Sequence, residues 1–198
     1  MDSHYRVLEK IDFPTLVTQE TLTDAGRESA FAAILARYAI DVVHFEHLIG
    51  HVPSLPYVAR ALGIPTMISL HDYYSVCWEI NLLNKDGRFC APESISETTC
   101  DICIGTTRGG LPHSQSSRRG FFGRMLAHID VIHCNTDEVA SRYRAVYPQL
   151  AKHSALLVRG VPIPDRQPPK SVVRERPMRV VVLGNFTLNK GAEFLLQL

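Results

Sequence analysis

The sequence lacks the features that mark membrane-spanning, secreted and nucleic-acid-binding proteins. None of its apolar runs reaches the roughly 20 residues that a transmembrane helix needs. The N-terminal residues MDSHYRVLEKIDF contain no apolar segment of the kind that a signal peptide carries. The formal net charge is only +1, so bulk charge indicates no nucleic-acid partner. We therefore expect a cytoplasmic protein.

What the sequence does contain is a regular alternation of strand-like and helix-like segments. Asp24 is a suitable cap for a first helix, and Pro53–Leu62 is predicted to form a second. Buried strands are predicted at Val42–Phe45 and Thr66–Leu70. This alternation predicts an α/β fold with a Rossmann-like, doubly wound parallel sheet.

The same alternation continues in the second half of the chain. A helix is predicted over Arg118–Ile129, followed by a strand at residues 130–134. Asn135 and Glu138 have the spacing of a capping box for the next helix, and residues 154–158 form a further predicted strand. Each of these segments fits the sheet predicted from the first half.

Proline content divides the chain into domains. Residues 1–160 are predicted to form one domain, with a short strand at residues 5–8 and an N-terminus that we expect to be truncated. Residues 161–177 are rich in proline, which stiffens the backbone and removes hydrogen-bond donors, and so predict a linker. Residues 178–198 then begin a second domain with a strand and a helix. That helix has no later element to pack against, so we expect the chain to be cut inside this domain.

Polar side chains follow two of the predicted strands, at the point where each strand ends. His71 and Asp72 follow Thr66–Leu70 directly. Ligands of open α/β sheets bind beyond the carboxyl ends of the strands, so this pair is a predicted site. His44, His47 and His51, at and after the preceding strand, are predicted to line the same rim. In the alternative interpretation, His71 and Asp72 only cap the loop, and one of the other histidines is a hydrogen-bonded core residue.

Four of the five cysteines lie close together in the segment that follows. Cys77, Cys90, Cys100 and Cys103 include one Cys-x-x-Cys pair, and in a reducing compartment such thiols predict a structural zinc site. Zinc would require all four sulfurs to converge, and would hold in place a loop that contains few apolar residues. The alternative is that the cysteines are small buried apolar residues. Cys134 stands apart and is predicted to belong to the core.

Arginine and phenylalanine are interleaved in the segment SSRRGFFGRML. If this helix lies on the surface, Arg118, Arg119 and Arg124 beside Phe121 and Phe122 could contact the inner face of an anionic membrane. In the alternative interpretation these arginines simply keep one helix face in water.

The segments DVVHFEHLIGH, GIPTMISLHDYY and GNFTLNKG follow one another along the chain. These three motifs, in this order, resemble those of GT-B glycosyltransferases of the group 1 family, also called family 4. The segment GNFTLNKG resembles the opening of the donor-binding domain, in which Gly184, Lys190 and Gly191 match and Asn185 stands where arginine is usual. The segments DVVHFEHLIGH and GIPTMISLHDYY resemble strand ends of the acceptor domain. The cysteine-bearing loop resembles that of a bacterial polysaccharide subgroup. The family's glycine-rich loop is not found in residues 1–30.

The resemblance implies an enzyme that moves a sugar from a nucleotide diphosphate sugar to a glycan or lipid-linked acceptor, with retained anomeric configuration and without a catalytic metal. It implies that His71 lies in the cleft, oriented by Asp72, and that His44, His47 and His51 contact the acceptor. Gly184, Asn185, Lys190 and Gly191 would bind the donor, and this fragment alone would be inactive. The alternatives are a nucleotide-sugar epimerase of the same fold and a non-catalytic, cysteine-clustered interaction module.

Overall fold

The computed structural model describes residues 10–109, 114–153, 156–158 and 196. All of these except Leu196 belong to a unit that spans Met1–Arg159. Several predictions concern residues outside the described ranges: the strand at residues 5–8, the linker 161–177 and the donor-binding residues Gly184, Asn185, Lys190 and Gly191.

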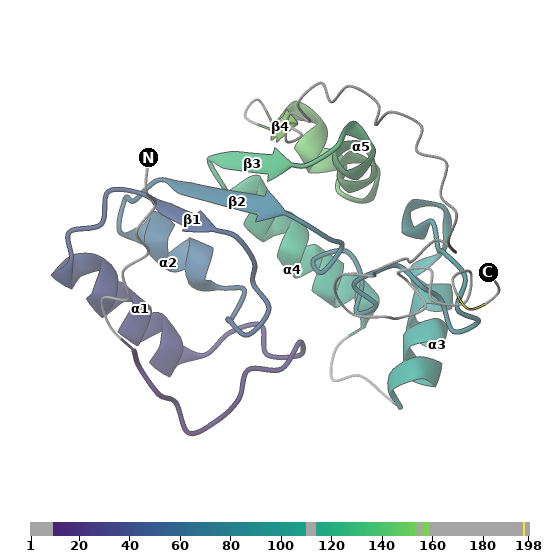
Figure 1. Ribbon diagram of the computed structural model, residues 1–198, viewed down its shortest axis with the longest axis horizontal. Coiled ribbons are helices and arrows are strands. Elements are labelled where there is room, and N and C mark those ends of the chain that lie inside the picture. The colour runs from purple at the N-terminus through teal and green to yellow at the C-terminus, as the bar shows by residue number, and fades with distance from the viewer. Residues whose placement is uncertain (1–9, 110–113, 154–155, 159–195, 197–198) are drawn as a thin grey trace, which may run out of the picture. The chain divides into compact units, whose positions relative to one another are not determined.

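The unit is built on a parallel sheet (Figure 1). Its strands are β1 (Val43–Phe45), β2 (Thr66–Leu70), β3 (Val131–Cys134) and β4 (Leu156–Val158), in the spatial order β1-β2-β3-β4. The predicted α/β, Rossmann-like class is confirmed. The order of the described strands runs in one direction, so the reversal that defines a doubly wound sheet is not seen within them.

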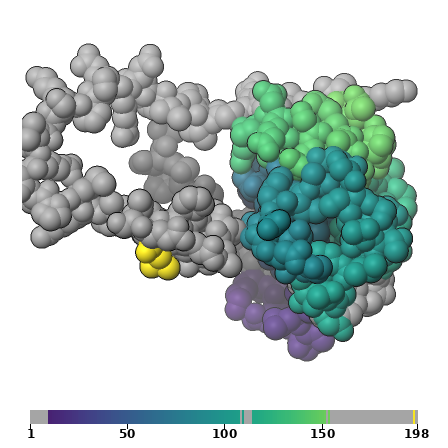
Figure 2. Space-filling view, turned by 90° about the vertical axis from the view of Figure 1, so that its right-hand side faces the viewer, coloured from purple at the N-terminus to yellow at the C-terminus, as the bar shows by residue number. Residues whose placement is uncertain are grey.

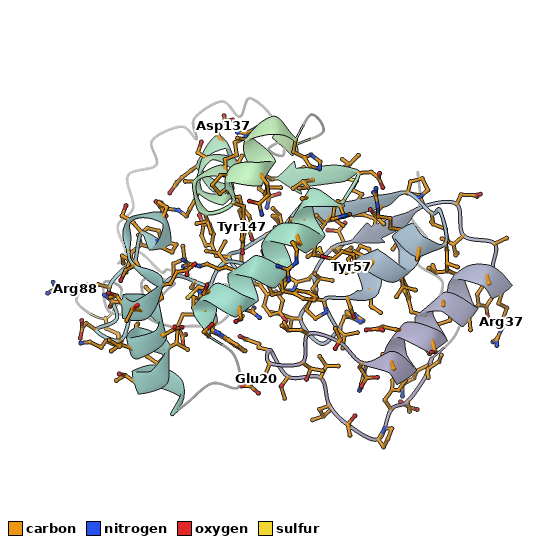
Figure 3. The ribbon with its side chains drawn as sticks, turned by 180° about the vertical axis from the view of Figure 1, so that it is seen from behind. Glu20, Arg37, Tyr57, Arg88, Asp137 and Tyr147 are labelled. Atoms are coloured by element: carbon orange, nitrogen blue, oxygen red, sulfur yellow. The ribbon has the colours of Figure 1, made fainter. Side chains whose placement is uncertain are left out.

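Helices connect and cover these strands. They are α1 (Ala25–Arg37), α2 (Leu55–Ala61), α3 (Glu97–Arg108), α4 (Gln115–Ala127) and α5 (Asp137–Val146), with 3-10 turns at Pro92–Ser94 and Pro148–Lys152. Helices α2 and α4 lie on the same face of the sheet (Figures 1 and 3). Within the described ranges, no helix has both the length and the apolar character needed to cross a membrane.

Side-chain caps set the start of several helices. The Asp24 carboxylate accepts a hydrogen bond from the Arg27 N–H at 2.9 Å, as predicted. The cap of α5 differs from the predicted capping box, because the Thr136 hydroxyl accepts the bond from the Val139 N–H at 3.2 Å. Asn135 therefore lies before the helix, where its side chain is available for other contacts.

Helix α3 was not predicted, because its cysteines were interpreted as part of a loop. Its first turn is capped by Ser96, whose hydroxyl accepts from the Thr99 N–H, and it ends at Gly109 in the left-handed conformation, φ 72°. Cys100 and Cys103 are one helical turn apart and so share a face of α3.

The segment between β2 and α3 is part of the core. Tyr74, Val76, Trp78 and Leu82 are all buried, so the prediction of a loop with few apolar anchors is wrong. Tyr74, Val76 and Leu82 belong to the same apolar cluster as Phe122 of α4. Figure 2 shows this part of the chain, in blue-green, gathered over one side of the unit. Apolar burial therefore already anchors the segment without a metal.

Two arginines of α4 are buried beneath this segment, which contradicts the predicted surface patch. Arg118 is fully buried, and its guanidinium lies 4.4 Å from the ring centre of Trp78, with Tyr74 and Phe122 on other sides. It donates hydrogen bonds to the carbonyls of Gln19, at 3.1 Å, and Tyr74. Aromatic faces and carbonyls here replace water around the cation, although loss of water still lowers its pKa.

Arg119 is also mostly buried, and its Nε donates to the Val76 carbonyl at 3.1 Å. Of the three arginines predicted to face a membrane, only Arg124 is exposed. Arg118 lies one turn from Phe122 and shares its buried helix face. The prediction of an exposed arginine face was based on charge and did not take this spacing into account. The two buried arginines tie the segment after β2 to α4.

We predict that Arg118→Ala lowers the free energy of unfolding by about 2–4 kcal/mol, since it removes a desolvated cation–π contact and leaves a cavity. The exposed Arg124→Ala, on the same helix, is the matched control and should change stability by less than about 0.5 kcal/mol. Urea denaturation followed by circular dichroism measures both. Equal effects of the two substitutions would contradict the structural role of Arg118.

Candidate functional site

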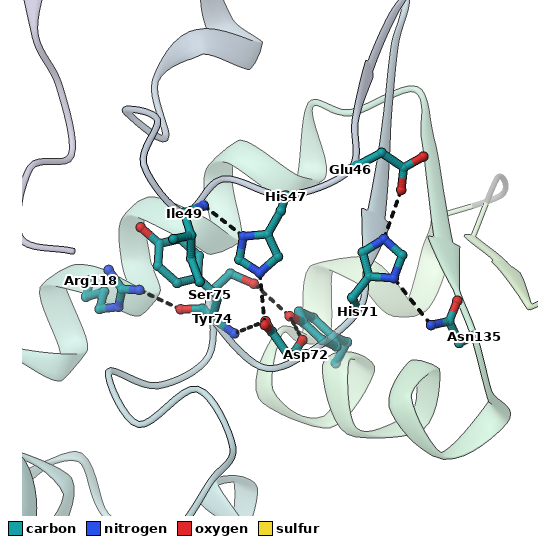
Figure 4. A network of polar contacts seen from close by, with 10 residues as sticks. Glu46, His47, Ile49, His71, Asp72, Tyr74, Ser75, Arg118 and Asn135 are labelled. Carbon is teal, nitrogen blue, oxygen red and sulfur yellow. Dashed lines mark hydrogen bonds and ion pairs between the residues drawn. The ribbon is translucent and has the colours of Figure 1, made fainter. Parts of the chain in front are cut away.

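Polar side chains from three neighbouring strands meet at one edge of the sheet (Figure 4). Parallel pairing aligns Phe45 with Ile68 and Leu70 with Cys134, so the carboxyl ends of β1, β2 and β3 lie side by side. The residues that follow these ends include Glu46, His71 and Asn135. This is the edge at which open α/β sheets bind ligands.

His71 occupies the centre of this network. Its Nε2 lies 2.9 Å from Glu46 Oε2, and its Nδ1 lies 3.4 Å from the Asn135 side-chain nitrogen. A carboxylate can only accept, so Nε2 carries the proton and donates it to Glu46. The Asn135 amide donates to Nδ1, and this long contact is the weaker of the two. The His71 side chain is 43% exposed, so solvent reaches part of the ring.

Glu46 links His71 to a second histidine. One of its carboxylate oxygens lies 3.3 Å from His44 Nδ1, while the other accepts from His71. The hydrogen bond from His71 is the largest cause of a lowered pKa at Glu46, and the charge interaction with His44 contributes less. Glu46 therefore stays ionised and holds the ring of His71 in one orientation.

Asp72 contacts a different histidine from the one predicted. His47 Nδ1 accepts from the Ile49 N–H at 2.8 Å, so Nε2 carries its proton and donates to Asp72 at 2.9 Å. The other carboxylate oxygen of Asp72 accepts from the Tyr74 N–H at 2.8 Å. The hydrogen bonds of Asp72 fix the start of the segment after β2, and Glu46 has the orienting role that we expected of Asp72.

The two remaining predicted histidines, His44 and His51, lie in different parts of the unit. His44 Nε2 lies 2.9 Å from Ser69 Oγ, which in turn lies 3.3 Å from His133 Nδ1, so His44 belongs to the network. His51 is exposed and lines a separate cavity of about 490 Å³ beside α1. The predicted rim therefore contains His44 and His47 but not His51.

Sequence reasoning missed Glu46 and Asn135. Both could have been found from the rule that already selected His71, because each directly follows a predicted strand at the same sheet edge. Glu46 lies between His44 and His47, which were predicted to line the rim, and Asn135 also has the spacing of a helix cap.

Hydrogen bonds hold the chain beneath the network, and little empty space remains beside it. The Tyr143 hydroxyl donates to the Asp72 carbonyl at 2.8 Å and accepts from Ser75 at 2.9 Å. The hollow beside His71 and Asp72 has a volume of only about 20 Å³, which is room for about one water molecule. These residues thus present a preorganised polar surface rather than a deep pocket.

The four clustered cysteines lie apart from this network, around a cavity of about 230 Å³. All four are free thiols. Burial raises the pKa of Cys77 to about 11 and also raises the pKa of Cys90 and Cys100, so these thiols are poor nucleophiles near neutral pH. Cys134 is fully buried in β3, as predicted for a core residue.

A single zinc ion does not fit the cysteines as the structure places them. In the part of the chain that is described, no three His, Cys, Asp or Glu side chains are close enough together to hold one metal ion. The four thiols line a shared space, whereas zinc requires them to converge on one point.

Comparison with known proteins identifies a family. Residues 2–163 match the family model described as Glycosyltransferase Family 4. Neither the curated proteins nor the solved structures include a significant match. The family model covers most of the chain and spans every described residue of the sheet, the histidine network and the cysteine cavity.

We predict that His71→Ala raises the pKa of Glu46 toward its ordinary value, because it removes the hydrogen bond that contributes most to the lowered pKa. His44→Ala should raise it by less. NMR titration of the side-chain carboxyl carbon measures these shifts, with the distant His51→Ala as the control. A Glu46 pKa that is the same in His71→Ala and in the unmodified protein would contradict this geometry.

Proposed function

The chain belongs to glycosyltransferase family 4, and from this we propose that the network at the carboxyl edge of its sheet takes part in sugar transfer. The reaction moves a sugar from a nucleotide diphosphate sugar to an acceptor hydroxyl, with retained configuration. The acceptor is a glycan or a lipid-linked precursor, in bacterial polysaccharide or lipopolysaccharide synthesis. The observation that carries the proposal is the Glu46–His71–Asn135 network at the sheet edge where ligands of this fold class bind.

In this proposal His71 is the residue that contacts a sugar. Its Nδ1 accepts a hydrogen bond from a sugar hydroxyl, which replaces the weak 3.4 Å contact with Asn135. Glu46 acts through His71, because it keeps the proton on Nε2 and so leaves Nδ1 as the acceptor. Holding the ring in place before the sugar arrives reduces the entropic cost of reaching the reactive geometry.

The other predicted site residues have supporting roles. His44 and His47 contribute to the acceptor-facing edge, and Asp72 holds His47 and the start of the following segment. Gly184, Asn185, Lys190 and Gly191 lie outside the described residues, and their role in donor binding follows from the sequence resemblance. There, Lys190 and a helix N-terminus would stabilise the leaving diphosphate.

We predict that His71→Ala lowers kcat/KM for sugar transfer on the order of a hundredfold, which is the usual loss for one positioned polar group at a reacting centre. The assay uses the whole protein that contains this domain, with a nucleotide sugar and an acceptor. His51→Ala is the matched control and should leave kcat/KM unchanged, because His51 lies outside the network.

Two results would contradict the proposal. One is a His71→Ala variant that is folded and as active as the His51→Ala control. The other is formation of an epimerised nucleotide sugar without any acceptor, which would mean that the protein changes ring stereochemistry instead of transferring the sugar.

A further inference from the structure

The cavity lined by the four clustered cysteines is a second candidate binding site in this unit, separate from the histidine network. It has a volume of about 230 Å³ and lies between α3 and the segment that joins β2 to α3. Buried side chains, among them Leu82 and Ile104, form its interior, and the exposed Lys85 and Ile102 lie at its rim. The cavity is therefore open to solvent on the side where these exposed residues lie.

The lining of the cavity is mostly apolar. Burial raises the pKa of Cys77, Cys90 and Cys100, so these thiols stay protonated near neutral pH. A protonated thiol is a small, polarizable apolar group with only a weak hydrogen-bond donor. The cysteines therefore extend an apolar surface, which is typical of pockets that bind small molecules.

Arg119 brings a buried positive charge to this apolar space. It is only 9% exposed, and its side chain lines the cavity. Its Nε donates to the Val76 carbonyl at 3.1 Å, and its Nη2 lies 3.7 Å from Cys100 Sγ. Neither partner is charged, and no carboxylate of the described residues forms an ion pair with Arg119. A buried cation without a counter-charge is unfavourable, so this guanidinium favours an anionic ligand.

The other charged side chains around the cavity are less buried than Arg119. Lys85 and Asp86 are exposed and form an ion pair with each other at 2.7 Å. Glu79 is partly exposed, so water weakens the effect of its charge. Arg119 is thus the charge that a ligand inside the cavity meets in the least polar surroundings.

We propose that this cavity binds a small amphiphilic carboxylate, which places its carboxylate on Arg119 and its apolar part against the thiols, Leu82 and Ile104. The planar donors of a guanidinium match a carboxylate. An apolar cavity of about 150 Å³ binds benzene, so about 230 Å³ accommodates a ligand of roughly nine non-hydrogen atoms. A medium-length alkyl chain that ends in a carboxylate has this size. The proposal rests on the cavity and on Arg119, and does not depend on sugar transfer.

The test is the binding of octanoate to the 198-residue chain, measured by isothermal titration calorimetry. We expect one saturable site. Octanol has the same alkyl chain without the charge and should bind about tenfold more weakly, because it lacks a charge-assisted hydrogen bond to Arg119. Octylamine, which is cationic at neutral pH, should bind more weakly still. Amide NMR shifts during the octanoate titration should appear at residues 99–104 of α3 and not at His71.

Two variants locate the site. Ile102→Asp places a negative charge at the rim and removes an apolar side chain, so it should weaken octanoate binding several-fold. Leu62→Asp is the matched control, since Leu62 is similarly exposed but lies at the end of α2 outside the cavity, and it should leave the affinity unchanged. Arg119→Gln should abolish the preference for octanoate over octanol.

Other results would overturn the proposal. A titration that shows no saturable octanoate site would mean that the cavity holds only solvent. Equal affinities for octanoate and octanol would mean that Arg119 only ties α4 to the segment after β2. Equal losses of affinity in Ile102→Asp and Leu62→Asp would place the bound octanoate elsewhere. If Arg119→Gln does not fold, the comparison of octanoate with octanol on the unmodified chain still decides.

Discussion

The parallel pairing of β1, β2 and β3 is the constraint on which the rest of the unit depends. It brings the carboxyl ends of the three strands to one edge, so that Glu46, His71 and Asn135 come from distant parts of the sequence to one place. Side chains alternate between the two faces of a strand, so a slip of one residue in β2 would move each of its side chains to the opposite face of the sheet and misplace His71. Core packing therefore enforces the register that the polar network needs.

The position of the segment after β2 depends on its contacts with two arginines of α4. Tyr74 and Trp78 are buried against the guanidinium of Arg118, and the carbonyls of Tyr74 and Val76 accept hydrogen bonds from Arg118 and Arg119. Carbonyl acceptors lie on the backbone, so these bonds fix the path of the chain. Fixing that path also fixes Asp72 and the loop in which Cys77 lies.

The sheet was largely predictable, whereas the partners within the site were not. β2 was predicted with the bounds that the structure has, because apolar β-branched runs that end in polar residues are a local signal. Asn135 was misassigned because it has the spacing of a helix cap, whereas Thr136, one residue later, is the residue that caps the helix. The burial of Arg118 and the pairing of His71 with Glu46 depend on side chains from distant elements, which no local pattern contains.

The central claim is that Glu46 holds His71 in one tautomer, with the proton on Nε2 and an unprotonated Nδ1 that accepts a hydrogen bond. Its most direct test is a long-range ¹H–¹⁵N NMR correlation of the histidine rings, at a pH where they are neutral. We predict the Nε2–H tautomer for His71, and the same tautomer for His47, whose Nδ1 accepts from the Ile49 N–H. A proton on Nδ1 of His71 would contradict the account, because that nitrogen could no longer accept a hydrogen bond from a sugar.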